Sequence, residues 1–186
     1  MSKVTFSVAC SLDGYQTDSD GDCSWAEPSD EVISAINEDL RDVSTYLYGR
    51  RMYQEMAVWE TDPALSAQSP ELERFAEAWK AADKVVFSRS LESVWTERTR
   101  LERELTTETL RAAKYGAQGN LTIEGPILAR SALERGMVDE VELLLCPIIV
   151  GGGSPVFPAG VFSKLELTRE RRFDNGMVQV RYDVRR

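Results

Sequence analysis

The chain contains no histidine, and this absence excludes several kinds of catalytic site. A Ser-His-Asp triad, a Cys-His nucleophilic pair and the H-x-E zinc signature of nucleoside deaminases all need an imidazole. The three cysteines, Cys10, Cys23 and Cys146, are widely spaced and form no C-x-x-C pair, so we expect neither a disulfide framework nor a metal site. Catalysis must therefore rest on carboxylates, backbone groups, tyrosine, lysine or a cofactor.

Long apolar runs and an excess of positive charge are also missing. No segment approaches the ~20 apolar residues of a membrane span, so we expect a cytoplasmic protein with no membrane partner. The 22 Lys and Arg against 31 Asp and Glu give a net charge of -9. Such an acidic chain is not expected to bind nucleic acid, because phosphate backbones are bound by clustered basic residues. Its 186 residues predict a single domain over 1–186.

Strand-like and helix-like segments alternate along the first two-thirds of the chain. Strands are expected at residues 3–10, 45–48, 84–87, 100–105 and 120–123. Helices are expected at residues 29–43, 50–56, 70–82, 107–115 and 126–135, with a loop at 60–69. This alternation predicts a sheet of parallel strands covered by helices.

The C-terminal third has a different pattern. Residues 141–150 form an almost continuous apolar run, which predicts a strand buried on both faces. Residues 165–173 and 177–184 flank Asn175-Gly176, a strong β-hairpin signal, and the second segment alternates between apolar and polar residues. The apolar run and the hairpin predict self-association through these strands.

Glycines and basic residues recur at three junctions where an expected strand meets the following segment. A glycine allows close backbone approach, a helix start favours an anion, and guanidinium groups bind phosphate in a forked geometry. Because ligands of parallel α/β sheets bind outside the carboxyl ends of the strands, these junctions predict a site for a phosphorylated cofactor. Surface turns with solvated arginines are the alternative. The candidate residues are Gly49, Arg50, Arg51, Ser88, Arg89, Gly125, Pro126, Ile127 and Leu128. The segment Gly151-Gly152-Gly153 lacks the phosphate-loop lysine and is interpreted as a turn.

Two acids and two aromatic residues are candidates for the chemistry itself. Asp30 and Glu31 open an expected helix, either as first-turn acids that complement the helix dipole or as catalytic carboxylates. In the catalytic interpretation, Asp30 hydrogen-bonds the N-C-N edge of a heterocycle and promotes protonation beside the carbon that accepts hydride. Trp25 and Tyr53 are candidates for substrate contact, with core packing as the alternative.

Taken in order, these motifs resemble the dihydrofolate reductase fold, in the branch formed by stand-alone relatives of the riboflavin-pathway reductase, the RibD C-terminal domain. The motifs are Ser11-Leu12-Asp13-Gly14, Gly21-Asp22 with Trp25, Leu47-Tyr48-Gly49-Arg50-Arg51-Met52-Tyr53, Lys84-Val85-Val86-Phe87-Ser88-Arg89, Gly136-Met137-Val138-Asp139-Glu140, and Pro147 with Val150-Gly151-Gly152-Gly153. The resemblance implies an α/β three-layer sandwich with a mostly parallel central sheet and an antiparallel C-terminal hairpin. It also implies NADPH at the three junctions and a homodimer.

The resemblance bears on individual residues as well. The segment Trp25-Ala26-Glu27-Pro28-Ser29-Asp30 is similar to the W-x-x-P-x-D segment of dihydrofolate reductase, whose Asp contacts the pterin, and this favours Asp30 over Glu31. Two positions depart from the pattern. Glu124 stands where the family usually has the first of two glycines, and Met52 stands where dihydrofolate reductase has a cofactor-binding Thr. A carboxylate at position 124 would repel a pyrophosphate unless its side chain points away.

The function implied is NADPH-dependent reduction of a small pyrimidine- or pteridine-like heterocycle, like the reduction of 5-amino-6-(5-phosphoribosylamino)uracil in riboflavin biosynthesis or the dihydrofolate reductase reaction. The alternative is a catalytically silent module on the same fold that holds a nucleotide or metabolite. Fold resemblance does not decide between them, because one fold can host many functions.

Overall fold

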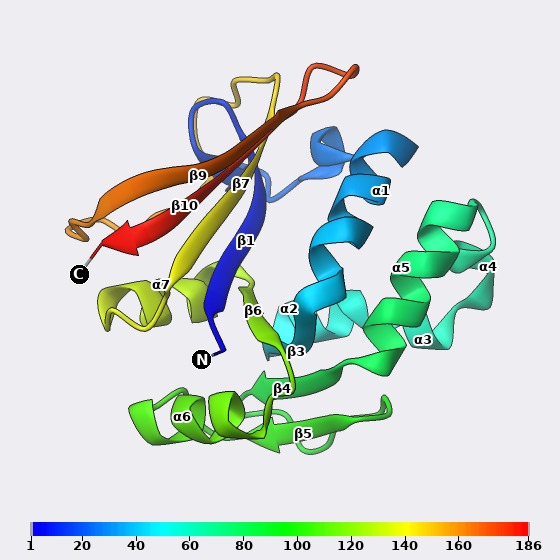
Figure 1. Cartoon of the computed structure of the whole chain (residues 1–186), viewed down its shortest axis with the longest axis vertical. Helices are drawn as coiled ribbons and strands as arrows, with labels where there is room; N and C mark the ends of the chain where they lie inside the picture. Colours follow the sequence, from blue (N-terminus) through cyan, green and yellow to red (C-terminus); the bar gives the residue numbers. More distant parts are fainter. Residues whose placement is uncertain (1, 186) are drawn as a thin grey trace.

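The computed structural model describes residues 2–185, which build an eight-stranded sheet with helices on both faces (Figure 1). The strand order is β5-β4-β3-β6-β1-β7-β10-β9. The bounds are β1 (Val4–Ser11), β3 (Val43–Gly49), β4 (Asp83–Phe87), β5 (Thr99–Glu102), β6 (Asn120–Glu124), β7 (Glu140–Cys146), β9 (Lys164–Arg172) and β10 (Val178–Arg185). A separate two-stranded sheet pairs β2 (Tyr15–Thr17) with β8 (Ser154–Pro155).

The sheet is parallel from β5 to β7 and antiparallel at β10 and β9. This confirms the predicted mostly parallel sheet with an antiparallel C-terminal hairpin. β1 is central: Thr5 pairs with Thr122 of β6 on one side and with Glu140 of β7 on the other. The carboxyl ends of β3, β4, β5 and β6 therefore lie side by side, where the three junctions meet.

Helices cover both faces of the eight-stranded sheet (Figure 1). Their bounds are α1 (Asp30–Asp39), α2 (Arg50–Met56), α3 (Val58–Thr61), α4 (Pro63–Ser66), α5 (Pro70–Ala81), α6 (Thr107–Gly116) and α7 (Pro126–Glu134), with 3-10 turns η1 (Ser24–Ala26) and η2 (Leu40–Asp42). Helices α6 and α7 pack on one face in a core with Phe6 and Leu121. On the other face, α2 and α5 pack against Tyr46 and Tyr48, and α1 packs against the end of β7 and the hairpin turn.

Four predicted boundaries are wrong. Strand β5 ends at Glu102 and not at residue 105. The expected loop at 60–69 holds the end of α3 and all of α4, which starts at an N-cap whose side chain, Asp62, accepts the Ala64 N–H. Helix α1 ends at Asp39, because residues 40–42 form a 3-10 turn that leads into β3. The apolar segment 141–150 is a strand only as far as Cys146, since Pro147 has no N–H to donate to a ladder.

Strand β7 also differs in character from the prediction. Its first half is apolar on one face only, because Glu140 and Glu142 point to the α1 side, where they are 8% and 7% exposed. After the strand, the N–H groups of Val150 and Gly151 donate to the Asp13 carboxylate at 3.2 and 2.8 Å. The glycine-rich segment is thus a turn tied to the end of β1, in agreement with its interpretation as a turn.

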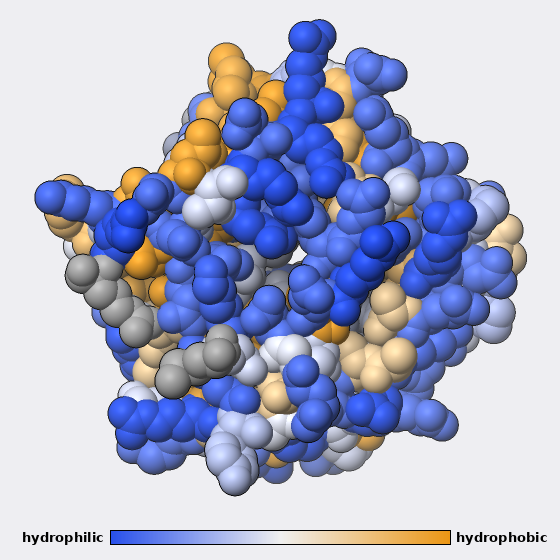
Figure 2. Space-filling view, in the orientation of Figure 1, coloured by the Kyte–Doolittle hydropathy of each residue, from blue (hydrophilic) through white to orange (hydrophobic). Residues whose placement is uncertain are grey.

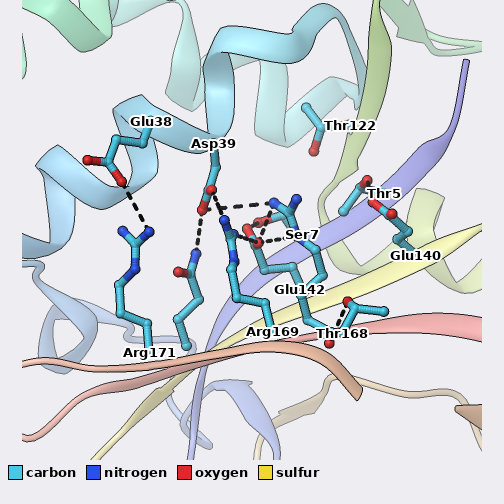
Figure 3. Close-up of polar contacts among 12 residues, drawn as sticks. Thr5, Ser7, Glu38, Asp39, Thr122, Glu140, Glu142, Thr168, Arg169 and Arg171 are labelled. Atoms are coloured by element: carbon cyan, nitrogen blue, oxygen red, sulfur yellow. Dashed lines mark hydrogen bonds and ion pairs between the residues drawn. The ribbon is translucent and has the colours of Figure 1, made fainter. Parts of the chain in front are cut away.

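A buried ion-pair network fixes α1 to the sheet (Figure 3). The Asp39 carboxylate accepts from Arg169 Nη1 at 2.6 Å and from Gln179 Nε2 at 2.8 Å. The Glu142 carboxylate accepts from Arg181 Nε at 2.7 Å and from Arg169 Nη2 at 3.1 Å. Both acidic side chains are less than one-tenth exposed. Every charge in this cluster therefore has an opposite partner from the chain itself.

Hydrophobic side chains also reach the surface along the C-terminal strands. Figure 2 shows them on the side of the molecule that carries β9 and β10. Leu165 and Leu167 of β9 are 42% and 50% exposed, and they pair with Val184 and Tyr182 of β10. No helix within residues 2–185 is long and apolar enough to cross a membrane.

Candidate cofactor site

A pocket of about 520 Å³ opens at the carboxyl ends of β3, β4, β5 and β6. It is lined by every residue that the sequence predicted for cofactor binding: Gly49, Arg50, Arg51, Ser88, Arg89, Gly125, Pro126, Ile127 and Leu128. Met52, Phe87, Ser90, Arg103, Glu104, Leu105, Ser131 and Arg135 complete the lining. The structure thus brings together three junctions that are far apart in the sequence, and their binding role remains a prediction.

Strand register explains this convergence. Gly49 pairs with Phe87 across β3 and β4, and Tyr48 pairs with Glu124 across β3 and β6. The residues that follow these pairs must therefore emerge at the same edge of the sheet. The pocket lies where open parallel sheets generally bind their ligands.

The start of α7 is open toward the pocket. Its N-cap is Gly125, which has no capping side chain, whereas α1, α4, α5 and α6 are capped by the side chains of Ser29, Asp62, Ser69 and Thr106. Gly125 has a φ of +91°, and a Cβ on it would lie 3.2 Å from the Met52 Cβ. Glycine is therefore required both for its backbone conformation and for the close approach of α2. The uncapped helix start suits an anion.

Five arginines line the pocket of this acidic protein. Arg103 donates to the carbonyls of Ser88 and Leu91 at 3.2 and 2.7 Å, so it holds the loop after β4. Arg50 donates to the Ser90 hydroxyl at 3.3 Å. These neutral partners leave the guanidinium charges uncompensated, and the local excess of positive charge favours a phosphate-bearing ligand.

The partners of Arg135 and Arg89 differ in charge. Arg135 donates to the carbonyl and hydroxyl of Ser131, one turn earlier on α7. Arg89 forms an ion pair with Glu104 at 3.0 Å. Arg51 has no hydrogen bond or ion pair with any residue from 2 to 185, so its charge is free for a ligand.

Glu124 points away from the pocket although the next residue, Gly125, lines it. Residues alternate across β6, so Leu121 and Ile123 face the α6 and α7 core while Glu124 faces Tyr46 and Tyr48. The expected repulsion of a pyrophosphate is thereby avoided.

Burial raises the pKa of the Glu124 carboxyl to about 7, with a further rise from Glu142, while the hydroxyl of Thr122, 3.5 Å away, acts in the opposite direction. From the sequence, Glu124 was expected to be an obstacle to a pyrophosphate, but its burial and raised pKa were not predicted. The alternation of apolar residues at 121 and 123 was the signal that could have found it.

Tyr53 lies in the core of the fold, the position that the packing alternative describes. Its side chain is fully buried in the core. Its hydroxyl accepts the N–H groups of Trp95 and Thr96 at 2.8 and 3.1 Å and contacts the Thr96 hydroxyl at 3.0 Å. Tyr53 therefore anchors the segment before β5 to α2.

The remaining predicted site residues lie outside the pocket lining. Trp25 is half-buried in η1, packs near the end of β7, and donates to the Asp22 carbonyl at 3.2 Å. Glu31 accepts the Asp174 N–H at 3.0 Å and so ties α1 to the hairpin turn. Asp30 is exposed in the first turn of α1 and has no polar partner within residues 2–185. Across these residues, no group of three or more Cys, Asp or Glu side chains is arranged to hold a metal ion.

Comparison with known proteins identifies the family. Residues 2–179 match the family model for the RibD C-terminal domain. The chain belongs to this family. Its relatives include the uncharacterized protein YyaP of Bacillus subtilis (strain 168), which is 24% identical over 184 residues, covering 97% of this chain and 94% of YyaP.

Solved structures show the same fold. A protein provisionally assigned to riboflavin biosynthesis in Shewanella sp. PV-4 has a TM-score of 0.76, 20% identity and full coverage of both chains. A pyrimidine reductase-like protein of Corynebacterium diphtheriae has a TM-score of 0.62 and 18% identity, with 100% of this chain and 92% of that one covered. The Thermotoga maritima diaminohydroxyphosphoribosylaminopyrimidine deaminase/5-amino-6-(5-phosphoribosylamino)uracil reductase has a TM-score of 0.66 and 18% identity, with 99% of this chain matching 57% of that longer chain.

Proposed function

We propose that this RibD C-terminal domain protein is an NADPH-dependent reductase of a small pyrimidine- or pteridine-like heterocycle, acting in the cytoplasm. The observation that carries the proposal is the convergence on one pocket of all nine predicted cofactor residues, three of them arginines, and two further arginines, in a protein with net charge -9. Its relatives support it, since one of them is named as a 5-amino-6-(5-phosphoribosylamino)uracil reductase. No nucleic-acid partner is proposed.

Different pocket residues bind different parts of NADPH. The open start of α7 at Gly125 binds the pyrophosphate, because its N–H groups have no capping side chain. Arg50 and Arg89 bind the 2′-phosphate by charge-assisted hydrogen bonds. When bound, NADPH supplies the hydride.

A proton must accompany the hydride, and two carboxyls are candidates to donate it. Asp30 was predicted from the sequence, and like Glu124 it lies outside the pocket lining. Glu124 directly precedes Gly125, and burial raises its pKa to about 7, so a large share of the carboxyl is protonated at neutral pH. We propose both carboxyls as candidate donors: Asp30 from its sequence motif, and Glu124 from its position next to Gly125 and its raised pKa.

The decisive test has two stages. NADPH binding is measured by calorimetry, and NADPH oxidation is then followed with 5-amino-6-(5-phosphoribosylamino)uracil and with dihydrofolate. Binding followed by oxidation with either heterocycle supports a reductase. Binding with no oxidation by any pyrimidine or pteridine favours the alternative, a catalytically silent nucleotide-binding module, and absence of NADPH binding overturns the proposal.

We also propose that the protein is a homodimer through the β9 and β10 face. Exposed Leu165 and Leu167, with Tyr182 and Val184 beside them, form an apolar sheet surface of the kind that a partner commonly covers. Light scattering at micromolar concentration should report a dimer, and Leu167→Glu should shift it toward monomer. Monomer across a wide concentration range for the unmodified protein contradicts this proposal.

A further inference from the structure

One residue of the pocket carries the charge of the expected ligand rather than that of its surroundings. Glu104 is the one carboxylate among the pocket-lining residues that the structure describes, where it is outnumbered by five arginines. Its Oε2 lies 3.0 Å from Nη2 of Arg89. Arg89, proposed above to receive the 2′-phosphate, is thus already paired with an anion that belongs to the chain.

The backbone beside this ion pair is held in place while the two charged side chains project outward. Arg103, just before Glu104, donates to the Ser88 carbonyl at 3.2 Å, and Leu105, just after it, is 5% exposed. Ser88 itself, just before Arg89, is 9% exposed. The side chains of the pair are far more accessible, at 76% for Arg89 and 52% for Glu104. The pair can therefore open without disturbing the fold.

We propose that Glu104 sets the preference of this pocket between a ribose with a 2′-phosphate and a ribose with a 2′-hydroxyl, an inference that rests on the proposed NADPH function. A 2′-phosphate that binds the Arg89 guanidinium must either displace Glu104 from Nη2 or use the remaining Nε and Nη1 donors, and in both cases it lies beside a like charge. A 2′-hydroxyl can donate to the carboxylate while the ion pair stays intact, as it does to the acidic residue of dinucleotide-binding folds. Glu104 therefore reduces the preference for NADPH over NADH that the arginines create.

The size of the effect follows from the exposure of the pair. Exposed ion pairs are worth about 0.2 to 1 kcal/mol, which corresponds to an affinity change of about 1.4- to fivefold. Neutralising Glu104 should therefore raise the affinity for NADPH by about 1.4- to fivefold. The affinity for NADH should stay unchanged or fall slightly, because its 2′-hydroxyl loses a charged acceptor.

The test is a binding measurement, so it does not depend on turnover. Calorimetric titrations compare the wild type with Glu104→Gln and Glu102→Gln, using NADPH, NADH, adenosine 2′,5′-bisphosphate and 5′-AMP. Glu102→Gln is the matched control because it removes the same charge at the end of β5, where the carboxylate lies 3.7 Å from Arg100 and does not line the pocket. We expect Glu104→Gln to bind NADPH and the bisphosphate more tightly, with the affinities for NADH and 5′-AMP unchanged or slightly lower, and the control to change none of the four.

Two results would overturn this inference while leaving the proposed function intact. One is wild-type binding of NADPH that Glu104→Gln changes no more than the control does. The other is an equal gain for all four compounds, which would show a general charge effect rather than selection at the 2′ position. If the wild type and both variants bind none of the four compounds, the proposed function fails together with the inference.

Discussion

Two regions of this molecule concentrate arginine, and they differ in what the guanidinium groups contact. Between α1 and the sheet, Arg169 and Arg181 are paired with the buried carboxylates of Asp39 and Glu142. In the pocket, four of the five arginines have neutral partners or none, and the fifth has one exposed carboxylate. Clustered arginines alone therefore do not indicate a ligand site. The arrangement that predicts one is uncompensated arginines beside an open helix start.

The largest expected effect separates the two regions by stability. Arg181→Met leaves Glu142 with weaker compensation in a buried site, which should lower the free energy of unfolding by about 3 kcal/mol, near the lower end for breaking a buried ion pair. Arg51→Met removes the same charge from an exposed pocket position and should change stability by less than about 0.5 kcal/mol. Denaturant unfolding of the two variants measures both values. Equal losses of unfolding free energy in the two variants would contradict the distinction between the paired arginines beside α1 and the uncompensated arginines of the pocket.

A second prediction uses the carboxyl of Glu124, a residue that directly precedes the pocket-lining Gly125 and whose pKa is also raised by Glu142. Its pKa is raised from an ordinary value of 4.5 to about 7 in the folded protein, so the native state holds a proton that the unfolded chain releases. The resulting stability is fully present below about pH 4.5 and is lost as the pH rises through 7, by at most about 3 kcal/mol. Glu124→Gln cannot ionise. The variant should therefore gain stability relative to the wild type between pH 5 and pH 8 in thermal unfolding, and a pH-independent difference contradicts this account of Glu124.

The third prediction tests whether the open helix start depends on Gly125. Gly125→Ala forces a side chain into a positive φ and against Met52, and should cost about 2 kcal/mol of stability and weaken NADPH binding. Gly136→Ala is the matched control at the other end of α7. Its φ is +63°, but no atom lies within 4 Å of the added Cβ, so a smaller loss of stability and unchanged NADPH binding are expected. Unfolding curves and NADPH titrations compare the pair, and similar effects on binding would show that the close approach is unimportant.

Sequence patterns predicted the pocket side of the molecule better than the α1 side. Helix starts at Ser29 and Ser69 and the strand-to-helix junctions are local signals, because each depends on neighbouring residues. Since parallel strands end together, local junctions were enough to predict that distant residues meet. The predicted single domain and homodimer are not tested by these features.

On the α1 side of the sheet, the structure depends on contacts between residues that are far apart in the sequence, and short sequence patterns do not contain these contacts. Nothing in the local sequence indicated that the charges of the ion-pair network cancel, because its members come from four elements. They are Asp39, Glu142, Arg169 and Arg181. For Tyr53 the local sequence could not choose between substrate contact and packing for a related reason: its hydroxyl contacts Thr96, more than forty positions further along the chain. Long-range pairing decides whether a charged or aromatic residue is structural or available.

The most direct test of the central claim is a calorimetric titration of the wild type with NADPH and NADH, repeated on Arg50→Ala, Arg89→Ala and Arg181→Met. The account predicts binding of one NADPH per chain, weaker binding of NADH, and a loss of about tenfold in NADPH affinity for each pocket variant, since a charge-assisted hydrogen bond contributes about 1.5 kcal/mol or more. Arg181→Met should bind NADPH like the wild type wherever it is folded. Equal affinity of the wild type for the two cofactors, or full NADPH affinity in both pocket variants, contradicts the account.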